Sequence, residues 1–127
     1  MGVNETKYNI MIKLFLLKPG FTDSNADNEG KIYYCPHCAM IEGVIKYYPQ
    51  IEEIIEIHHV DFKRPRPAVI EMIGEENQSC PVLIIDNKPA DCTDTSYFEK
   101  HGDKLFVNSP DLILKYLAAK FGIGISH

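Results

Sequence analysis

The chain has 127 residues, of which 45% are hydrophobic and 24% charged, and its formal net charge is -5. These values are typical of one soluble domain with a single core. The acidic balance argues against nucleic-acid binding, because the basic run Lys63–Arg66 is short and interrupted by proline. We interpret that run as the solvated start of a helix. No apolar run reaches the roughly 20 residues that a membrane span requires.

The first ten residues are polar and lack the apolar core of an export signal. We therefore expect a disordered or loosely ordered N-terminus over residues 1–10, a folded domain over residues 11–127, and a cytoplasmic location. In a reducing compartment, the four cysteines are more often thiols or metal ligands than structural disulfides.

The first predicted elements are a buried strand, a long loop and a helix. Residues 11–17 form a nearly continuous apolar run, which favours a strand buried on both faces. A loop rich in Gly, Asn and Asp follows over residues 18–34. Residues 35–48 then predict a helix, because Pro36 stands in its first turn, apolar residues recur at helical spacing, and Pro49 ends it.

The remaining elements alternate in type. They are a strand over 54–62, a short helix over 66–77 that ends near Gly74, a buried strand over 80–86, a turn over 86–90, one further strand, and a helix over 108–122. The last helix has Asn108 or Ser109 as its cap and Pro110 at its first position. A strand, a helix and a strand joined by a short crossover predict a right-handed parallel unit. We therefore predict an α/β fold with a small mixed sheet covered by helices on both faces.

Three features together resemble the thioredoxin superfamily: the first strand, the pair Cys35 and Cys38 at the start of a helix, and Pro81 at the head of a later strand. The resemblance covers the chain from about Met11 to Gly122. It implies a thioredoxin-like fold with a central mixed four-stranded sheet flanked by helices. It also implies that Pro81 is cis and lies beside the two cysteines.

Smaller patterns refine this resemblance. Residues 34–38 are similar to a glutaredoxin motif, with His37 where Tyr is usual. Residues 108–122 are similar to the close of a glutathione-transferase N-terminal domain, with Asn108 where an acidic residue is usual. The whole combination looks closest to an uncharacterised bacterial thioredoxin-like family that is labelled only as a domain of unknown function.

The motif Cys35-Pro36-His37-Cys38 is the candidate catalytic dithiol. Cys35 would face unpaired N–H groups and the positive end of the helix dipole, which favours the thiolate that attacks a disulfide. Pro36 fixes the turn without giving up a needed N–H group. His37, when protonated, adds positive charge near the sulfur. Cys38, one turn further and more buried, would be the resolving thiol. Idle cysteines in the same fold are the alternative interpretation.

Cys80 adds a third sulfur, because it precedes the proline that the resemblance places beside the dithiol. Cys35, Cys38 and Cys80 together could hold a soft metal such as Zn²⁺ or Cu(I), although their spacing matches no zinc-finger pattern. In the other two interpretations, Cys80 is a small buried apolar residue, or it forms a mixed disulfide with Cys35. The sequence leaves open whether the Cys92 side chain points toward this site.

The predicted substrate contacts surround this dithiol. The backbone of Cys80, with Pro81, would dock the substrate as an added strand, and Tyr34 would form one wall of a groove. By the resemblance, Lys18 and Ser109 match residues that hold glutathione carboxylates. A solvated strand end for Lys18 and a helix cap for Ser109 are equally complete explanations.

We therefore predict a thiol-disulfide oxidoreductase of glutaredoxin or thioredoxin type, with no bound cofactor. Its expected partners are a protein or small-molecule disulfide, and glutathione or a thioredoxin system as reductant, with no nucleic acid and no membrane. A soft-metal binding or delivery module and a non-catalytic thioredoxin-like binding domain are the alternatives.

Overall fold

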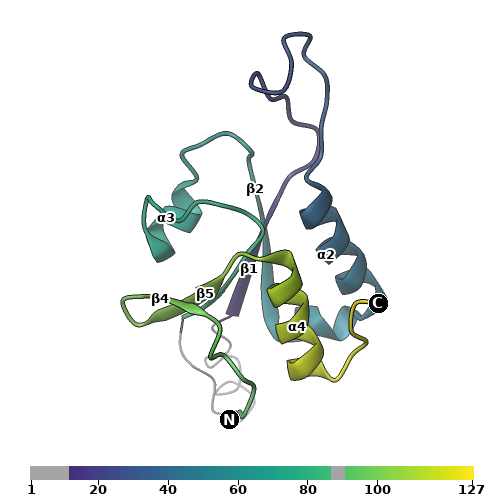
Figure 1. The fold of residues 1–127 in the computed structure, drawn as a ribbon, viewed down its shortest axis with the longest axis vertical. Coiled ribbons are helices and arrows are strands. Elements are labelled where there is room, and N and C mark those ends of the chain that lie inside the picture. The colour runs from purple at the N-terminus through teal and green to yellow at the C-terminus, as the bar shows by residue number, and fades with distance from the viewer. Residues whose placement is uncertain (1–11, 87–90) are drawn as a thin grey trace.

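The computed structural model describes residues 12–86 and 91–127. The expected loose start over residues 1–10, and most of the expected turn over 86–90, lie outside the described residues. The elements are β1 (Ile12–Leu17), α2 (Pro36–Tyr47), the 3-10 helix η1 (Pro49–Glu53), β2 (Ile55–Val60), α3 (Pro67–Ile73), β3 (Val82–Ile85), β4 (Glu99–His101), β5 (Lys104–Val107) and α4 (Pro110–Phe121) (Figure 1).

The sheet is mixed, and its strand order is β2-β1-β3-β5-β4. β1 and β2 pair in parallel, which confirms the predicted strand-helix-strand unit, and the other pairs are antiparallel. The expectation of four strands is wrong, because five strands are present in the described residues. β4 and β5 form a hairpin whose two turn residues are Gly102 and Asp103, and Gly102 has a φ of 61°. The short polar strand β4 carries no apolar alternation by which it could have been recognised.

The sheet divides the core into two layers, because alternate residues of a strand point to opposite faces. Leu14, Leu16 and Leu83 pack in the cluster that includes buried residues of α2 and α4. Phe15 and Ile84 pack in a second cluster with α3. Figure 1 shows α2 and α4 on one face of the sheet and α3 on the other. This arrangement confirms the prediction of an α/β fold with a mixed sheet covered on both faces.

Helix ends follow local signals in the sequence. α2 has Cys35 as its N-cap and Pro36 at its first position, and it ends just before Pro49. α3 ends near Gly74 as predicted, because Gly74 adopts a φ of 90° and closes the helix directly after Ile73.

Residues 18–34, here named the loop arm, project from the end of β1 before the chain returns to α2 (Figure 1). The foot of the arm is closed by backbone hydrogen bonds. The Gly20 N–H donates to the Tyr33 carbonyl at 2.9 Å, and the Tyr33 N–H donates to the Phe21 carbonyl at 2.7 Å. The Phe21 ring stacks on Phe62, with 4.3 Å between ring centroids. The arm is therefore anchored to the segment after β2, and the N-terminus of α2 lies at its foot.

Candidate active site

Cys35 occupies the N-cap of α2, where its backbone is extended, with φ -82° and ψ 115°. Its sulfur accepts a hydrogen bond from the Cys38 N–H at 3.2 Å. The first turn contains no acidic residue that would oppose a negative charge there. The half-buried Cys35 sulfur thus lies at the positive end of the helix dipole and receives one of the N–H groups there.

Cys38 lies one turn into α2 and is buried, with 2% of its surface exposed. Burial raises the pKa of the Cys38 thiol to about 12, and it outweighs the Leu17 N–H, which donates to this sulfur at 3.3 Å and lowers the pKa. The Cys38 thiol therefore keeps its proton at neutral pH. Both cysteines are free thiols, so the structure describes the site in its dithiol form.

Cys80 is half-buried and precedes Pro81 through a cis peptide bond, as the resemblance predicts. Burial raises the pKa of the Cys80 thiol to about 11, and the nearby Cys35 sulfur raises it further. Charge on Cys80 likewise raises the pKa of Cys38. Cys35 and Cys80 both pack against the core cluster that contains Cys38, so the structure brings the three sulfurs into one neighbourhood.

The interpretation of Lys63–Arg66 as a solvated run is wrong for Arg66, which is only 5% exposed. Its Nε donates to the carbonyls of Asp61 and Phe62 at 3.2 Å and 3.1 Å, and its Nη1 donates to the Gln78 carbonyl at 2.7 Å. Its Nη2 also donates to the Phe62 carbonyl. The guanidinium lies over the Phe62 ring, 5.7 Å from the centroid. Arg66 thus ties the end of β2 to the segment before Cys80.

The charge of Arg66 has no carboxylate partner, because none of the ion pairs among the described residues includes it. Burial lowers the pKa of this guanidinium, while negative charge on Cys80 raises it. In return, Arg66 lowers the pKa of Cys80, against the larger effect of burial. A buried cation beside a thiol favours negative charge on sulfur. Nothing in the sequence distinguishes Arg66 from its solvated neighbours, so the pattern alone could not identify it.

Residues 12–125 match the family described as "Protein of unknown function (DUF3088)". The chain belongs to this family. The match confirms the expectation of a family labelled by unknown function, and the family description names neither a fold nor an activity. No curated protein and no solved structure matches the chain. The matched range contains all the helices and strands described above, and with them the three neighbouring sulfurs and Arg66.

The other predicted contacts lie on elements around the dithiol or have partners of their own. His37 is exposed in the first turn of α2, and Tyr34 is 63% exposed beside Cys35. Lys18 is exposed and pairs with Asp61 at 3.3 Å. Ser109 caps α4, since its hydroxyl accepts the Leu112 N–H at 3.3 Å.

Residues 12–86 and 91–127 bear on two expectations, one about a metal site and one about a membrane span. There, no group of three or more His, Cys, Asp or Glu side chains is arranged to hold a metal ion. The alternative of a metal held by Cys35, Cys38 and Cys80 thus receives no geometric support. Within the same ranges, every helix is too short or too polar to cross a membrane.

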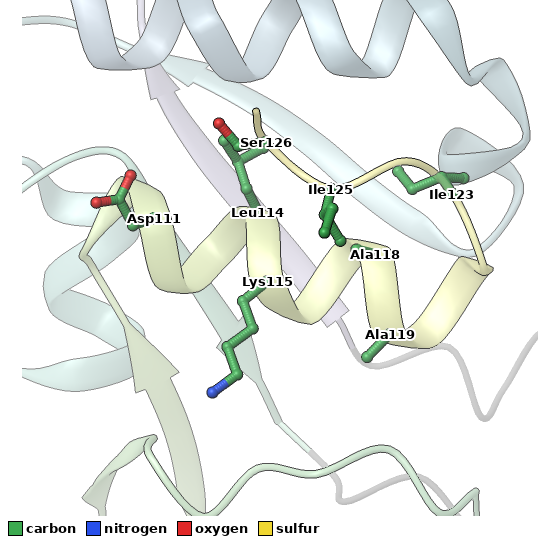
Figure 2. Close-up of a pocket in the computed structure, with 8 residues that line it drawn as sticks. All are labelled: Asp111, Leu114, Lys115, Ala118, Ala119, Ile123, Ile125 and Ser126. Carbon is green, nitrogen blue, oxygen red and sulfur yellow. The ribbon is translucent and has the colours of Figure 1, made fainter.

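A separate groove runs between α4 and the C-terminal segment, with a volume of about 640 Å³ (Figure 2). Its lining is mostly apolar and includes Leu114, Ala118, Ile123 and Ile125. It contains no thiol and no imidazole, so the candidate chemistry lies elsewhere, at the start of α2.

Proposed function

We propose that this protein is a thiol-disulfide oxidoreductase with a thioredoxin-like fold. The fold assignment rests on the parallel pair β1 and β2, the dithiol at the start of the intervening helix, and the cis proline before β3. The observation that carries the function is the difference between the two sulfurs of α2. Cys35 receives a helix N–H group near the surface, whereas Cys38 is buried and protonated.

The reaction begins at Cys35. Its thiolate attacks one sulfur of a substrate disulfide, a Cys35–substrate disulfide forms, and the other substrate sulfur leaves as a thiolate that takes a proton from water. Cys38 then attacks the Cys35 sulfur and passes its proton to the departing second substrate sulfur. The substrate gains two electrons and two protons, and the protein dithiol becomes a disulfide. A dithiol reductant, or two molecules of glutathione, returns the protein to its starting state.

The high pKa of Cys38 sets the order of these steps. A protonated, buried thiol is a poor nucleophile, so Cys38 does not compete with Cys35 for the incoming disulfide. Once the mixed disulfide has formed, the Leu17 N–H, 3.3 Å from the Cys38 sulfur, stabilises the thiolate as it develops. The departing substrate thiolate is the base that accepts the proton.

Substrate docking is assigned to the surface around Cys35. The backbone of Cys80, with Pro81, receives the substrate as an added strand. The exposed Tyr34 ring contacts the docked substrate from one side. Lys18 and Ser109 have local partners, in Asp61 and the Leu112 N–H. Glutathione is therefore proposed as a reductant and not as a ligand that these two residues hold.

Reduction of bis(2-hydroxyethyl) disulfide, coupled either to glutathione or to a thioredoxin system, tests the function. Cys35→Ser should abolish turnover. Cys38→Ser should form a stable mixed disulfide, detected as a mass adduct on Cys35. Cys92→Ser is the matched control, since Cys92 is an exposed free cysteine outside α2, and it should keep full activity. Activity that persists in Cys35→Ser would falsify the proposal.

A further inference from the structure

A groove lies between the start of the loop arm and the connection from β2 to α3. It comprises two cavities of about 430 Å³ and 770 Å³. Both cavities are lined by Lys18, Asp61, Lys63, Arg64 and Arg66. We name this combined feature the basic groove. Each of the two cavities has a volume in the range of pockets that hold small molecules.

The side chains that line the basic groove are mostly cationic, whereas the chain as a whole has a negative net charge. Four cationic side chains face only two carboxylates, those of Asp61 and Asp23, so the groove has a local excess of positive charge in a protein of net charge -5. Asp61 pairs with Lys18. Among the ion pairs of the described residues, none includes Lys63 or Arg64. These exposed cations, with the buried Arg66 behind them, are available to an anion.

Arg66 connects the basic groove to the neighbourhood of Cys80, and no sulfur lines either cavity. Arg66 lines both cavities, and its Nη1 donates at 2.7 Å to the Gln78 carbonyl, the same oxygen that the Cys80 thiol contacts at 3.9 Å. Phe62 lines the larger cavity and packs against the same core cluster as Cys35 and Cys80. A substrate docked on Cys35 and the backbone of Cys80 would therefore have the basic groove on the Arg66 side of its binding surface.

We propose that the basic groove binds the carboxylates of an anionic disulfide substrate. The inference rests on the proposed function and names the substrate class of the same dithiol. A groove of one charge sign raises the local concentration and the association rate of ligands of the opposite sign, by about 10-fold or more at low ionic strength. The carboxylates can belong to an acidic peptide segment or to a small dicarboxylate disulfide.

Single-turnover reduction by the pre-reduced protein tests this substrate class without an external reductant. The probes are 3,3′-dithiodipropionate, which is anionic, bis(2-hydroxyethyl) disulfide, which is neutral, and cystamine, which is cationic. At low ionic strength the anionic probe should react about 10-fold faster than the cationic one. The double variant Lys63→Gln/Arg64→Gln should reduce that ratio to about twofold or less, as should high salt.

The matched control is Lys46→Gln/Lys100→Gln, which removes the same charge from the last turn of α2 and from β4, at the opposite edge of the sheet from β2. It should leave the ratio unchanged. An anionic probe that is no faster than the cationic one, or an equal loss in both double variants, would overturn the inference. The neutral probe reports the proposed function separately, because its reduction does not depend on charge in the groove.

A second measurement does not need disulfide turnover. Alkylation of Cys35 by anionic iodoacetate and by neutral iodoacetamide is followed by peptide mass mapping, with Cys92 of the same molecule as internal control. The iodoacetate-to-iodoacetamide rate ratio should be several-fold higher at Cys35 than at Cys92, and it should fall in Lys63→Gln/Arg64→Gln. Equal ratios at the two cysteines would contradict an anion-attracting groove, even in a protein that reduces no disulfide.

The source of the carboxylates is decided by a pair of peptide disulfides that differ only in Glu or Lys beside the cysteine. An acidic peptide that reacts about 10-fold faster than dithiodipropionate assigns a protein segment as the substrate, and similar rates assign a small dicarboxylate. A lysine peptide that reacts as fast as the acidic peptide refutes both assignments of the substrate.

Discussion

Replacing Arg66 with leucine tests the most buried charge described in the protein. The guanidinium donates to the carbonyls of Asp61, Phe62 and Gln78, and leucine leaves these oxygens without that donor. Hydrogen bonds to charged groups each contribute about 1.5–3 kcal/mol. The variant also avoids burying a charge, which offsets part of this loss. We therefore expect Arg66→Leu to lower the free energy of unfolding by about 2–4 kcal/mol.

Urea unfolding at pH 7 measures this change through the midpoint and the slope. Arg64→Leu is the matched control, because Arg64 is exposed and makes one long contact, 3.5 Å, with the Ser79 hydroxyl. It should change stability by no more than about 0.5 kcal/mol. Arg66→Lys should lower the free energy of unfolding by an intermediate amount, since lysine keeps the charge but cannot reach all three carbonyls. A loss below about 1 kcal/mol for Arg66→Leu, or equal losses for Arg66→Leu and Arg64→Leu, would refute the reasoning.

Three further predictions concern single side chains. The folded protein raises the pKa of Cys38 to about 12. The stability that this protonated thiol contributes is therefore fully present below the pKa of an unfolded cysteine, about 8.5, and is lost as the pH rises above it. In urea titrations, Cys38 contributes a loss of about 2 kcal/mol between pH 9 and 10.5, so Cys38→Ala should lose less stability than the wild type, by about that amount, and Cys92→Ala should match the wild type. The raised pKa of Cys80 adds a loss of its own, which persists in Cys38→Ala. Ser109→Ala should cost about 1 kcal/mol as a lost helix cap and leave the KM for glutathione unchanged; a raised KM would assign it to binding. Phe21→Ala should speed tryptic cleavage within the loop arm several-fold, because the stacked ring anchors it, whereas Phe21→Tyr should not; equal cleavage would contradict the anchor.

Local signals in the sequence were sufficient for the three α-helices, for the strands β1, β2 and β3, and for the position of the dithiol. Proline at the first helical position and the N-cap preceding it place Cys35 at the start of α2, because helix initiation depends on a few adjacent residues. Likewise, the apolar run of β1 requires burial on both faces, and the structure divides it between the two core layers. The cis state of Pro81 was implied by the resemblance and not by any local pattern.

The sequence by itself therefore determined the α/β class, the parallel pair β1 and β2, and a helix that opens with two cysteines. Only the tertiary structure decided that a fifth strand completes the sheet, that Arg66 is buried beside Cys80, and that the exposed cations next to it line a groove. The physical reason is the range of the interactions. Caps and apolar runs act between neighbours in the chain, whereas the burial of Arg66 depends on Gln78, twelve residues away, whose carbonyl accepts a hydrogen bond from the guanidinium.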